Sequence, residues 1–252
     1  MRPRELSPLI AILLLAFSGE PLSADTIRVA AASNFRNTLE EIAEHFERQS
    51  GHDVVLIFGS TGKHYAQLVN GAPYDLFFAA DTERPQKLEE RGLSLAGKRY
   101  TYAIGRLALW SPRDSAPAPE DRLASGDYRY LAIANPALAP YGRAAEETLR
   151  SLGLWQDVSG RVVTGENIGQ TYQFVFSGNA DLGFVARSQL LREDREPTGS
   201  WWLVPESMHR PIAQDAVQLR DGDAAGEFFE FARGSRAVEI IRAHGYSVPD
   251  DR

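Results

Sequence analysis

The chain has 252 residues, of which 43% are hydrophobic and 24% are charged. This is an ordinary globular composition, so it excludes disordered, collagen-like and low-complexity classes, and the length predicts one or two domains. The sequence has no cysteine, which excludes disulfides, thiolate metal sites, a cysteine nucleophile and a lipidated N-terminal cysteine. The formal net charge is −7, whereas nucleic-acid-binding proteins carry an excess of basic residues, so we expect no nucleic-acid partner.

The N-terminus has the pattern of an export signal. Arg2 and Arg4 precede an apolar run of ten residues at 8–17, and a small-residue cleavage site ends at Ala24. We therefore predict a signal peptide over residues 1–24, cleaved near Ala24, and a soluble exported mature chain. The alternative is an uncleaved membrane anchor, but the apolar run is short against the roughly 20 residues that span a bilayer.

Short apolar runs alternate with amphipathic segments along the rest of the chain. In chain order, we predict strands at residues 27–32, 54–58, 76–80, 103–110, 131–134, 161–164 and 182–185. We predict helices at residues 38–49, 65–69, 144–152 and 168–176. Runs that are apolar throughout are typical of strands buried on both faces. The alternation predicts an α/β fold with mostly parallel sheets, and residues 111–120 form a proline-rich surface loop.

Four turns between these elements are small and polar. They contain Ser33-Asn34, Gly59-Ser60-Thr61-Gly62, residues 135–142, and Gly165-Glu166-Asn167-Ile168. In open α/β sheets, ligands bind beyond the carboxyl ends of the strands, and a helix N-terminus offers unpaired N–H groups to an anion. For any single Ser or Asn, a helix cap is the simpler interpretation. Four such turns together favour an anion-binding site.

Motifs of other functions are incomplete. A phosphate-binding loop would need Gly and Ser or Thr where this chain has Ile57 and His64. Ser60 and Lys63 match the Ser-x-x-Lys motif of penicillin-recognising serine enzymes, but the Lys-Thr-Gly element is absent. The five histidines show no metal-ligand spacing. We therefore predict no catalytic residue and no cofactor, and a secreted acyl-transfer enzyme that uses Ser60 and Lys63 stays as an alternative.

Several motifs occur together in one order. They are Ala-Ala-Ser-Asn at 31–34, Gly-Ser-Thr-Gly at 59–62, Gly-Ala-Pro-Tyr-Asp-Leu-Phe-Phe-Ala-Ala-Asp at 71–81 and Asn-Pro-x-Leu-Ala-Pro-Tyr-Gly-Arg-Ala-Ala at 135–145. Further along the chain they are Gly-Glu-Asn-Ile at 165–168, Asn-Ala-Asp-Leu-Gly-Phe-Val-Ala at 179–186, Pro-Ile-Ala-Gln-Asp-Ala-Val at 211–217 and His-Gly-Tyr-Ser at 244–247. On these motifs, the chain resembles the periplasmic molybdate-binding proteins of ABC importers over nearly its whole mature length. The resemblance implies a two-lobed clamshell periplasmic-binding-protein fold with crossovers near residues 103–106 and 212–217. The first lobe would contain residues 25–104 and 213–252, and the second lobe residues 105–212.

The resemblance also implies the ligand contacts. Position by position they fall on Ser33, Asn34, Ser60, Tyr141 and Ile168, and the Ile168 contact is a backbone N–H. Some members have a tyrosine where this chain has Ala186, so the chain resembles the branch that uses Asn and Tyr in the earlier turns. These groups are neutral donors, so they would hold molybdate as an oxyanion without direct protein–metal bonds. Each charge-assisted hydrogen bond of this kind contributes about 1.5–3 kcal/mol.

The implied function is that of a periplasmic receptor and not of an enzyme. It would capture molybdate, or tungstate of nearly the same size and charge, between its lobes and pass it to the membrane permease of an ABC importer. We expect a monomer. Neutral donors disfavour protonated phosphate, because its O–H would be buried without an acceptor. Two binding alternatives stay open: a receptor for another oxyanion such as sulfate, and an exported adaptor without a small ligand.

Overall fold

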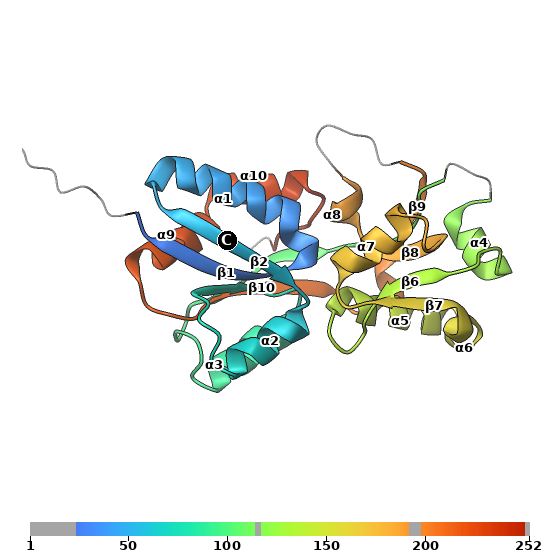
Figure 1. The fold of residues 1–252 in the computed structure, drawn as a ribbon, viewed down its shortest axis with the longest axis horizontal. Helices are drawn as coiled ribbons and strands as arrows, with labels where there is room; N and C mark the ends of the chain where they lie inside the picture. The colour runs from blue at the N-terminus through green and yellow to red at the C-terminus, as the bar shows by residue number, and fades with distance from the viewer. Residues whose placement is uncertain (1–23, 114–116, 192–197, 250–252) are drawn as a thin grey trace, which may run out of the picture.

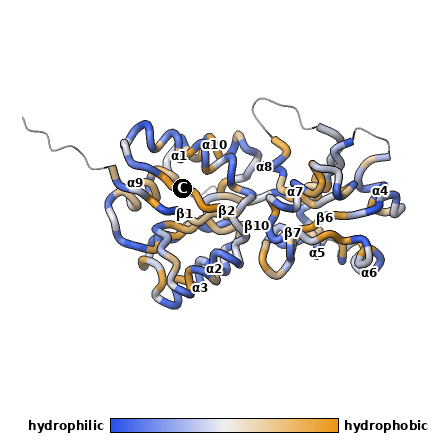
Figure 2. The backbone as a smooth tube through the Cα atoms, in the orientation of Figure 1, coloured by the Kyte–Doolittle hydropathy of each residue, from blue (hydrophilic) through white to orange (hydrophobic). Residues whose placement is uncertain are grey.

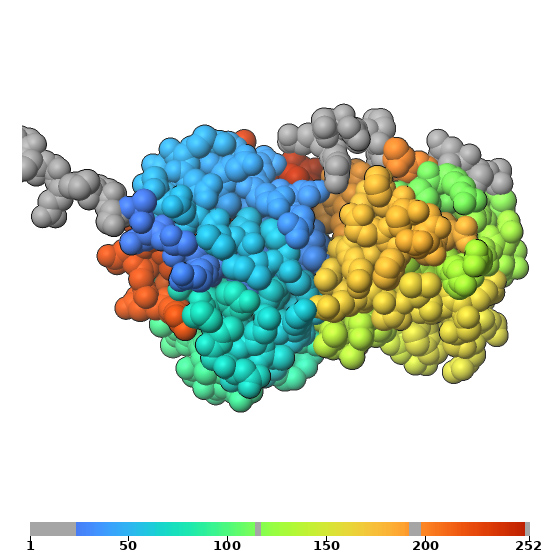
Figure 3. All heavy atoms as spheres, in the orientation of Figure 1, coloured from blue at the N-terminus to red at the C-terminus, as the bar shows by residue number. Residues whose placement is uncertain are grey.

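A computed structural model describes residues 24–113, 117–191 and 198–249. It has two lobes, each built on one five-stranded sheet, which lie side by side along the long axis of the molecule (Figure 1). The N-terminal and C-terminal parts of the chain share one lobe, and the middle of the chain forms the other (Figure 3). The predicted signal peptide, apart from Ala24, lies outside the described residues. No helix in the described ranges is long and apolar enough to cross a membrane.

The first sheet is mostly parallel. Its strands lie in the order β2 (Asp53–Gly59), β1 (Thr26–Ala32), β3 (Leu76–Phe78), β10 (Ile212–Gln218) and β4 (Arg99–Gly105). β1 pairs in parallel with β2 and β3, whereas β10 runs antiparallel to both of its neighbours.

Helices cover both faces of the first sheet (Figure 1). They are the short helix η1 (Ser33–Phe35), α1 (Arg36–Ser50), α9 (Asp223–Phe231) and α10 (Ser235–Ala243) on one face, and α2 (Thr61–Val69) and α3 (Glu83–Glu90) on the other. Successive side chains of a strand point to opposite faces. Val29 of β1 therefore shares a core with Phe46 of α1, while Ala30 shares another with Leu68 of α2. Apolar residues gather along the strands and polar residues on the outer turns of the helices (Figure 2).

The second sheet repeats this arrangement. Its strands lie in the order β7 (Val162–Gly165), β6 (Leu131–Ala134), β8 (Leu182–Ala186), β5 (Leu107–Ser111) and β9 (Ser200–Leu203). The helical segments of this lobe are α4 (Pro119–Ser125), α5 (Pro140–Ser151), α6 (Trp155–Val158), η2 (Ser159–Arg161), α7 (Ile168–Phe176), α8 (Arg187–Leu190) and η3 (Glu206–Met208). Leu149 of α5 and Val175 of α7 enter different cores, so these two helices cover opposite faces of the sheet.

The chain crosses between the lobes twice, and each crossing leads into the antiparallel strand of a sheet. The first crossing is at Arg106, between β4 and β5, and the second leads into β10 at Ile212. The single strand predicted over residues 103–110 is therefore wrong, because it breaks at Arg106 into strands of two different sheets. The apolar run continues through the break, so its pattern contained no sign of the change of sheet.

Other predicted bounds also change. α2 begins at Thr61 and not at residue 65, because the Ser60 side chain caps it there. α4 begins at Pro119, inside the predicted surface loop 111–120, where proline at the first helical position is pre-organised for a helix. Residues 114–116 of that loop lie outside the described residues.

Candidate functional site

The strand registers bring the polar turns together. Ala32 pairs with Gly59 at the ends of β1 and β2, and Ser33 and Ser60 follow directly. In the second sheet, β6 and β7 also end side by side, ahead of α5 and α7. Because parallel strands end at the same edge of a sheet, each lobe presents its two turns from one edge.

All five predicted contacts line one small cavity: Ser33, Asn34, Ser60, Tyr141 and Ile168. Its volume in this structure is about 10 Å³, close to the roughly 10–15 Å³ that one water molecule requires. Thr61 and Asn167 also line it, and the sequence prediction did not select them. Within the described part of the chain, no charged side chain lines this cavity. The wall is therefore built from neutral groups of both lobes.

Three helices begin at this cavity. Thr61 is the first residue of α2, Ile168 is the first of α7, and Tyr141 follows Pro140 at the start of α5. First-turn N–H groups have no acceptor within their own helix, and proline has no N–H. Among the described residues, the N–H groups of Thr61, Tyr141 and Ile168 have no hydrogen-bond partner. The positive ends of three helix dipoles, each with an unused donor, therefore face one cavity.

The Ser60 side chain adds a hydroxyl donor. It is only 2% exposed. Its oxygen accepts the Lys63 N–H at 3.4 Å, which leaves its own hydrogen without an acceptor among the described residues. Ser60 thus both caps α2 and offers a hydrogen to a ligand.

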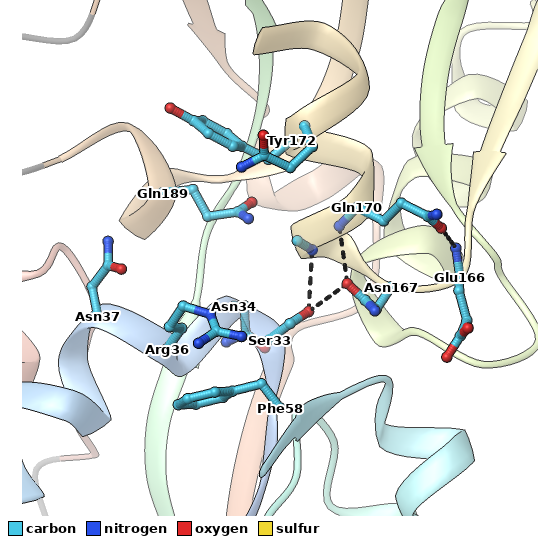
Figure 4. A pocket seen from close by; sticks show the side chains of 12 residues that line it. Ser33, Asn34, Arg36, Asn37, Phe58, Glu166, Asn167, Gln170, Tyr172 and Gln189 are labelled. Atoms are coloured by element: carbon cyan, nitrogen blue, oxygen red, sulfur yellow. Dashed lines mark hydrogen bonds between the residues drawn. The ribbon is translucent and has the colours of Figure 1, made fainter. Parts of the chain in front are cut away.

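Ser33 and Asn34 already use their side-chain hydrogens within the protein. The Ser33 hydroxyl donates to Asn167 Oδ1 at 3.0 Å and accepts the Gly169 N–H at 3.1 Å (Figure 4). The Asn34 amide donates to Gln214 Oε1 at 2.8 Å and to the Tyr246 hydroxyl at 3.0 Å. In this arrangement, the two residues form the cavity wall without a spare side-chain hydrogen.

The lobes touch each other around the cavity. Lys63 Nζ lies 2.8 Å from a carboxylate oxygen of Glu166, and the Gly62 N–H donates to the Leu138 carbonyl at 2.8 Å. Arg84 also donates to a carbonyl of the second lobe, that of Ala137, at 2.9 Å. The structure is therefore a closed form of the two lobes.

A second cavity has a volume of about 360 Å³, and Figure 4 shows the side chains that line it. It shares Ser33, Asn34 and Asn167 with the small cavity. Arg36 lines it, but its guanidinium lies 4.0 Å from the Phe58 ring centroid and 3.1 Å from a Glu40 oxygen, so its charge is already engaged. The larger cavity therefore adjoins the small one and is lined mainly by polar side chains.

Burial keeps the hydroxyl groups around the small cavity neutral. It raises the pKa of Tyr141 well above the usual value of 10 and the pKa of Tyr246 to about 12. His64 lies behind the Ser60 turn, with Nε2 3.2 Å from the Ala31 carbonyl oxygen, and burial lowers its pKa from 6.5. At neutral pH these groups carry no charge, so a bound ion would meet no charged side chain among the described residues that line the cavity.

Sequence reasoning missed the residues that surround the predicted contacts. Gln214 is completely buried and Tyr246 is 5% exposed, and both bond to Asn34. A glutamine inside the apolar strand Ile-Ala-Gln-Asp-Ala-Val was a usable signal, because a buried amide needs partners. Tyr246 lies just past the last helix, in the His-Gly-Tyr-Ser motif at 244–247, but nothing in that motif showed that its hydroxyl reaches Asn34.

Comparison with known proteins gives consistent matches. Residues 27–247 match the family described as bacterial extracellular solute-binding protein. The chain is 41% identical to the molybdate-binding protein ModA of Azotobacter vinelandii, over 96% of this chain and 98% of that protein. It is 39% identical to ModA of Rhodobacter capsulatus, over 94% of each chain.

A solved structure agrees with these matches. The periplasmic molybdate-binding protein of Azotobacter vinelandii superposes with a TM-score of 0.85 at 41% identity, covering 89% of this chain and 100% of that one. This confirms the predicted α/β fold with two lobes. The chain belongs to the family of bacterial extracellular solute-binding proteins.

Proposed function

We propose that this protein captures molybdate outside the cytoplasm and delivers it to the membrane permease of an ABC importer. The ion would lie between residues 25–104 with 213–252 and residues 105–212. The observation that carries the proposal is the convergence of three helix N-termini and a free serine hydroxyl on one cavity without charged side chains. Relatives of this chain that are molybdate-binding proteins favour molybdate as the oxyanion.

The proposed contacts are the five predicted residues. Ser60 donates its hydroxyl, and Tyr141, Ile168 and Asn34 donate their backbone N–H groups. Ser33 donates its hydroxyl after release from Asn167. Burying a dianion without compensation is very costly, but donors that are already oriented replace its water shell, each contributing about 1.5–3 kcal/mol.

Selectivity follows from the same donors. Tungstate, with nearly the same size and charge, binds as molybdate does, whereas sulfate is smaller and leaves some donors too far away. Phosphate that retains a proton presents an O–H where the wall offers mainly donors. The capture requires no cofactor and no catalytic step, and the protein acts as a monomer in the periplasm after cleavage near Ala24.

The Lys63 contact disfavours the acyl-transfer alternative. The Lys63 amine forms an ion pair with Glu166 of the other lobe, and it is the Lys63 backbone N–H that reaches the Ser60 oxygen. A base for Ser60 must lie within hydrogen-bond reach of its hydroxyl. An unchanged protein mass after incubation with a penicillin is the expected result, and a covalent adduct on Ser60 would revive that alternative.

Thermal unfolding of the mature chain tests the proposal. Samples contain molybdate, tungstate, sulfate, phosphate or no added anion. At a thousand times the dissociation constant, binding stabilises the folded state by about 4 kcal/mol. For a domain of this size that raises the Tm by roughly 8–16 °C. We expect such shifts with molybdate and tungstate and small ones with sulfate and phosphate, whereas an unchanged Tm with all four anions contradicts the proposal.

A further inference from the structure

A buried amide on the second crossing connects both lobes to the cavity wall. Gln214 lies on β10, two residues after the strand begins at Ile212, and its side chain is completely buried. Its Oε1 accepts hydrogen bonds from Asn34 Nδ2 at 2.8 Å and from the Tyr102 hydroxyl at 3.0 Å. Its Nε2 donates to the Tyr141 hydroxyl at 3.4 Å. One side chain thus contacts two of the predicted ligand contacts, one from each lobe.

The pairing of β10 with β4 is irregular at Gln214, and this irregularity affects how its amide is placed. The pairing of β10 with β4 shifts between Gln214, which faces Ala103, and Asp215, which faces Thr101. Tyr102 is left without an opposite residue, which is the arrangement of a β-bulge. Bulges re-aim side chains and occur often beside functional sites. Here the bulge leaves the Tyr102 hydroxyl within hydrogen-bond distance of Gln214.

The first crossing leaves no room for a side chain at the same place. A Cβ at Gly105 would lie 2.7 Å from Gln214 Nε2 and would overlap the Tyr141 hydroxyl. Real Cβ atoms essentially never come that close to another heavy atom. The two crossing segments and Tyr141 are therefore packed in direct contact, with Gln214 between them.

A second bridge lies on the other side of Asn34. The Tyr246 hydroxyl lies 2.8 Å from the Ser188 hydroxyl of the second lobe. The backbone carbonyl oxygen of Asn34 lies 3.1 Å from the Ser188 hydroxyl and 2.8 Å from the Tyr246 hydroxyl, and each hydroxyl donates its single hydrogen to one acceptor at a time. Asn34 is thus held from both lobes only when the lobes are closed.

We propose that Gln214 is a positioning residue that couples lobe closure to oxyanion binding by fixing Asn34 and Tyr141 at the cavity. This inference rests on the proposed function. Gln214 touches no ligand, because it does not line the cavity. When the lobes part, the hydrogen bond between Gln214 and Tyr141 is broken. Gln214 therefore holds Asn34 of the first lobe and Tyr141 of the second lobe in place together only in the closed form.

Gln214→Leu tests the coupling, with Gln218→Leu as the matched control. Gln218 is on the same strand, is 2% exposed and bonds to the Arg220 carbonyl at 3.0 Å, outside the cavity wall. The measurements are the dissociation constant and dissociation rate for molybdate, and the Tm without added anion. We expect Gln214→Leu to weaken binding by about tenfold or more, mainly through faster dissociation. Gln218→Leu should lower the Tm and change the affinity less than about twofold.

A double-mutant cycle with Tyr141→Phe separates positioning from general damage. If Gln214 acts through Tyr141, the loss of affinity in the double variant is smaller than the sum of the two single losses, in free-energy terms. If Gln214→Leu does not fold, Gln214→Asn replaces it in the test. This variant keeps a polar amide in the core, but its side chain is one methylene shorter and no longer reaches both Asn34 and Tyr141, so binding should again weaken. Equal affinities for Gln214→Leu and the unaltered protein, or additive losses, overturn the coupling. Absence of molybdate binding by the unaltered protein contradicts the proposed function instead.

Discussion

The two sheets are arranged alike: β7, β6, β8, β5 and β9 of the second lobe take the places of β2, β1, β3, β10 and β4 of the first. The two lobes nevertheless contribute different chemical groups to the cavity. In the first lobe, Ser33 and Ser60 come directly after β1 and β2, so their side chains lie at the wall. In the second lobe, residues 135–139 separate β6 from α5, and the unused donors are backbone N–H groups of Tyr141 and Ile168. Side-chain substitutions should therefore affect binding strongly in the first lobe and weakly at Ile168.

The two lobes also differ in the side chain that packs against the end of a strand, behind the turn that lines the cavity. A Cβ at Gly59 would lie 2.9 Å from His64 Nε2, and one at Gly165 would lie 2.6 Å from Thr171 Oγ1. Both strands thus end in a glycine against a side chain of the following helix. Only the first lobe places a titratable ring there, so a pH-dependent stability should come from that lobe.

Gly105→Ala should have the largest effect, because it disturbs both lobes at once. The added methyl group displaces Tyr141 and Gln214. Overpacking costs up to about 3 kcal/mol, which corresponds to a roughly 100-fold weaker affinity for molybdate in a calorimetric titration. Gly160→Ala is the control, because nothing lies within 4 Å of a Cβ there. Unchanged affinity in Gly105→Ala would show that the crossings are not packed against the site.

Ser60→Ala tests the side-chain contribution of the first lobe. Loss of one donor to a buried oxyanion should weaken molybdate binding by about 1–3 kcal/mol. Loss of the α2 cap also lowers the stability of the ligand-free protein by about 0.5–2 kcal/mol. Titration and ligand-free unfolding must therefore be measured together, with Ser177→Ala, an exposed serine bonded to the Gln173 carbonyl, as the control. Normal affinity in Ser60→Ala would remove Ser60 from the site.

The His64 ring should make the free energy of unfolding depend on pH. Burial lowers its pKa in the folded state from 6.5, so below that pH the unfolded chain takes up a proton more readily than the folded chain. This destabilising contribution is absent at high pH, and the Tm should fall as the pH decreases through about 6.5, the ordinary pKa of the ring. The raised pKa of Asp81 acts in the opposite direction, but from an ordinary value of 3.8.

His64→Gln isolates this contribution. The variant should show a shallower fall of Tm with decreasing pH, measured in ligand-free samples. Thr171→Val, behind the corresponding turn of the second lobe, should keep the slope of the unaltered protein. Identical slopes in all three proteins would place the pH dependence elsewhere.

Ile168→Val should have the smallest effect on binding. The donor at this position is the backbone N–H, which the substitution retains, and the buried side chain loses one methylene. Affinity for molybdate should change less than about threefold, while stability falls by about 0.5–1.5 kcal/mol. A large loss of affinity would mean that the lobes do not differ in the way described.

The polar turns could be predicted from the sequence because they depend only on the residues next to them in the chain. Ser33 and Ser60 follow apolar runs, and parallel strands place such positions at one edge. The apolar pattern gave no sign of the break at Arg106, since the run from 103 to 110 is apolar on both sides of it, and only the family resemblance implied a crossover near residues 103–106. α3 was missed because its sequence is mostly charged, and only Pro85 and Leu88 are buried.

The partners of the site residues depend on contacts between distant parts of the chain. The bond between Asn34 and Gln214 joins residues 180 positions apart. No local pattern specifies such a pair, so the sequence did not show which groups the Asn34 amide would bind. The structure shows that both hydrogens of that amide are used by the protein.

The most direct test of the site is a crystal structure of the protein with molybdate, using anomalous scattering to locate the metal. We predict one ion in the small cavity, within hydrogen-bond distance of the Ser60 hydroxyl and of the N–H groups of Tyr141 and Ile168. An ion bound in the larger cavity beside Arg36, or an ion with direct protein–metal bonds, would contradict it.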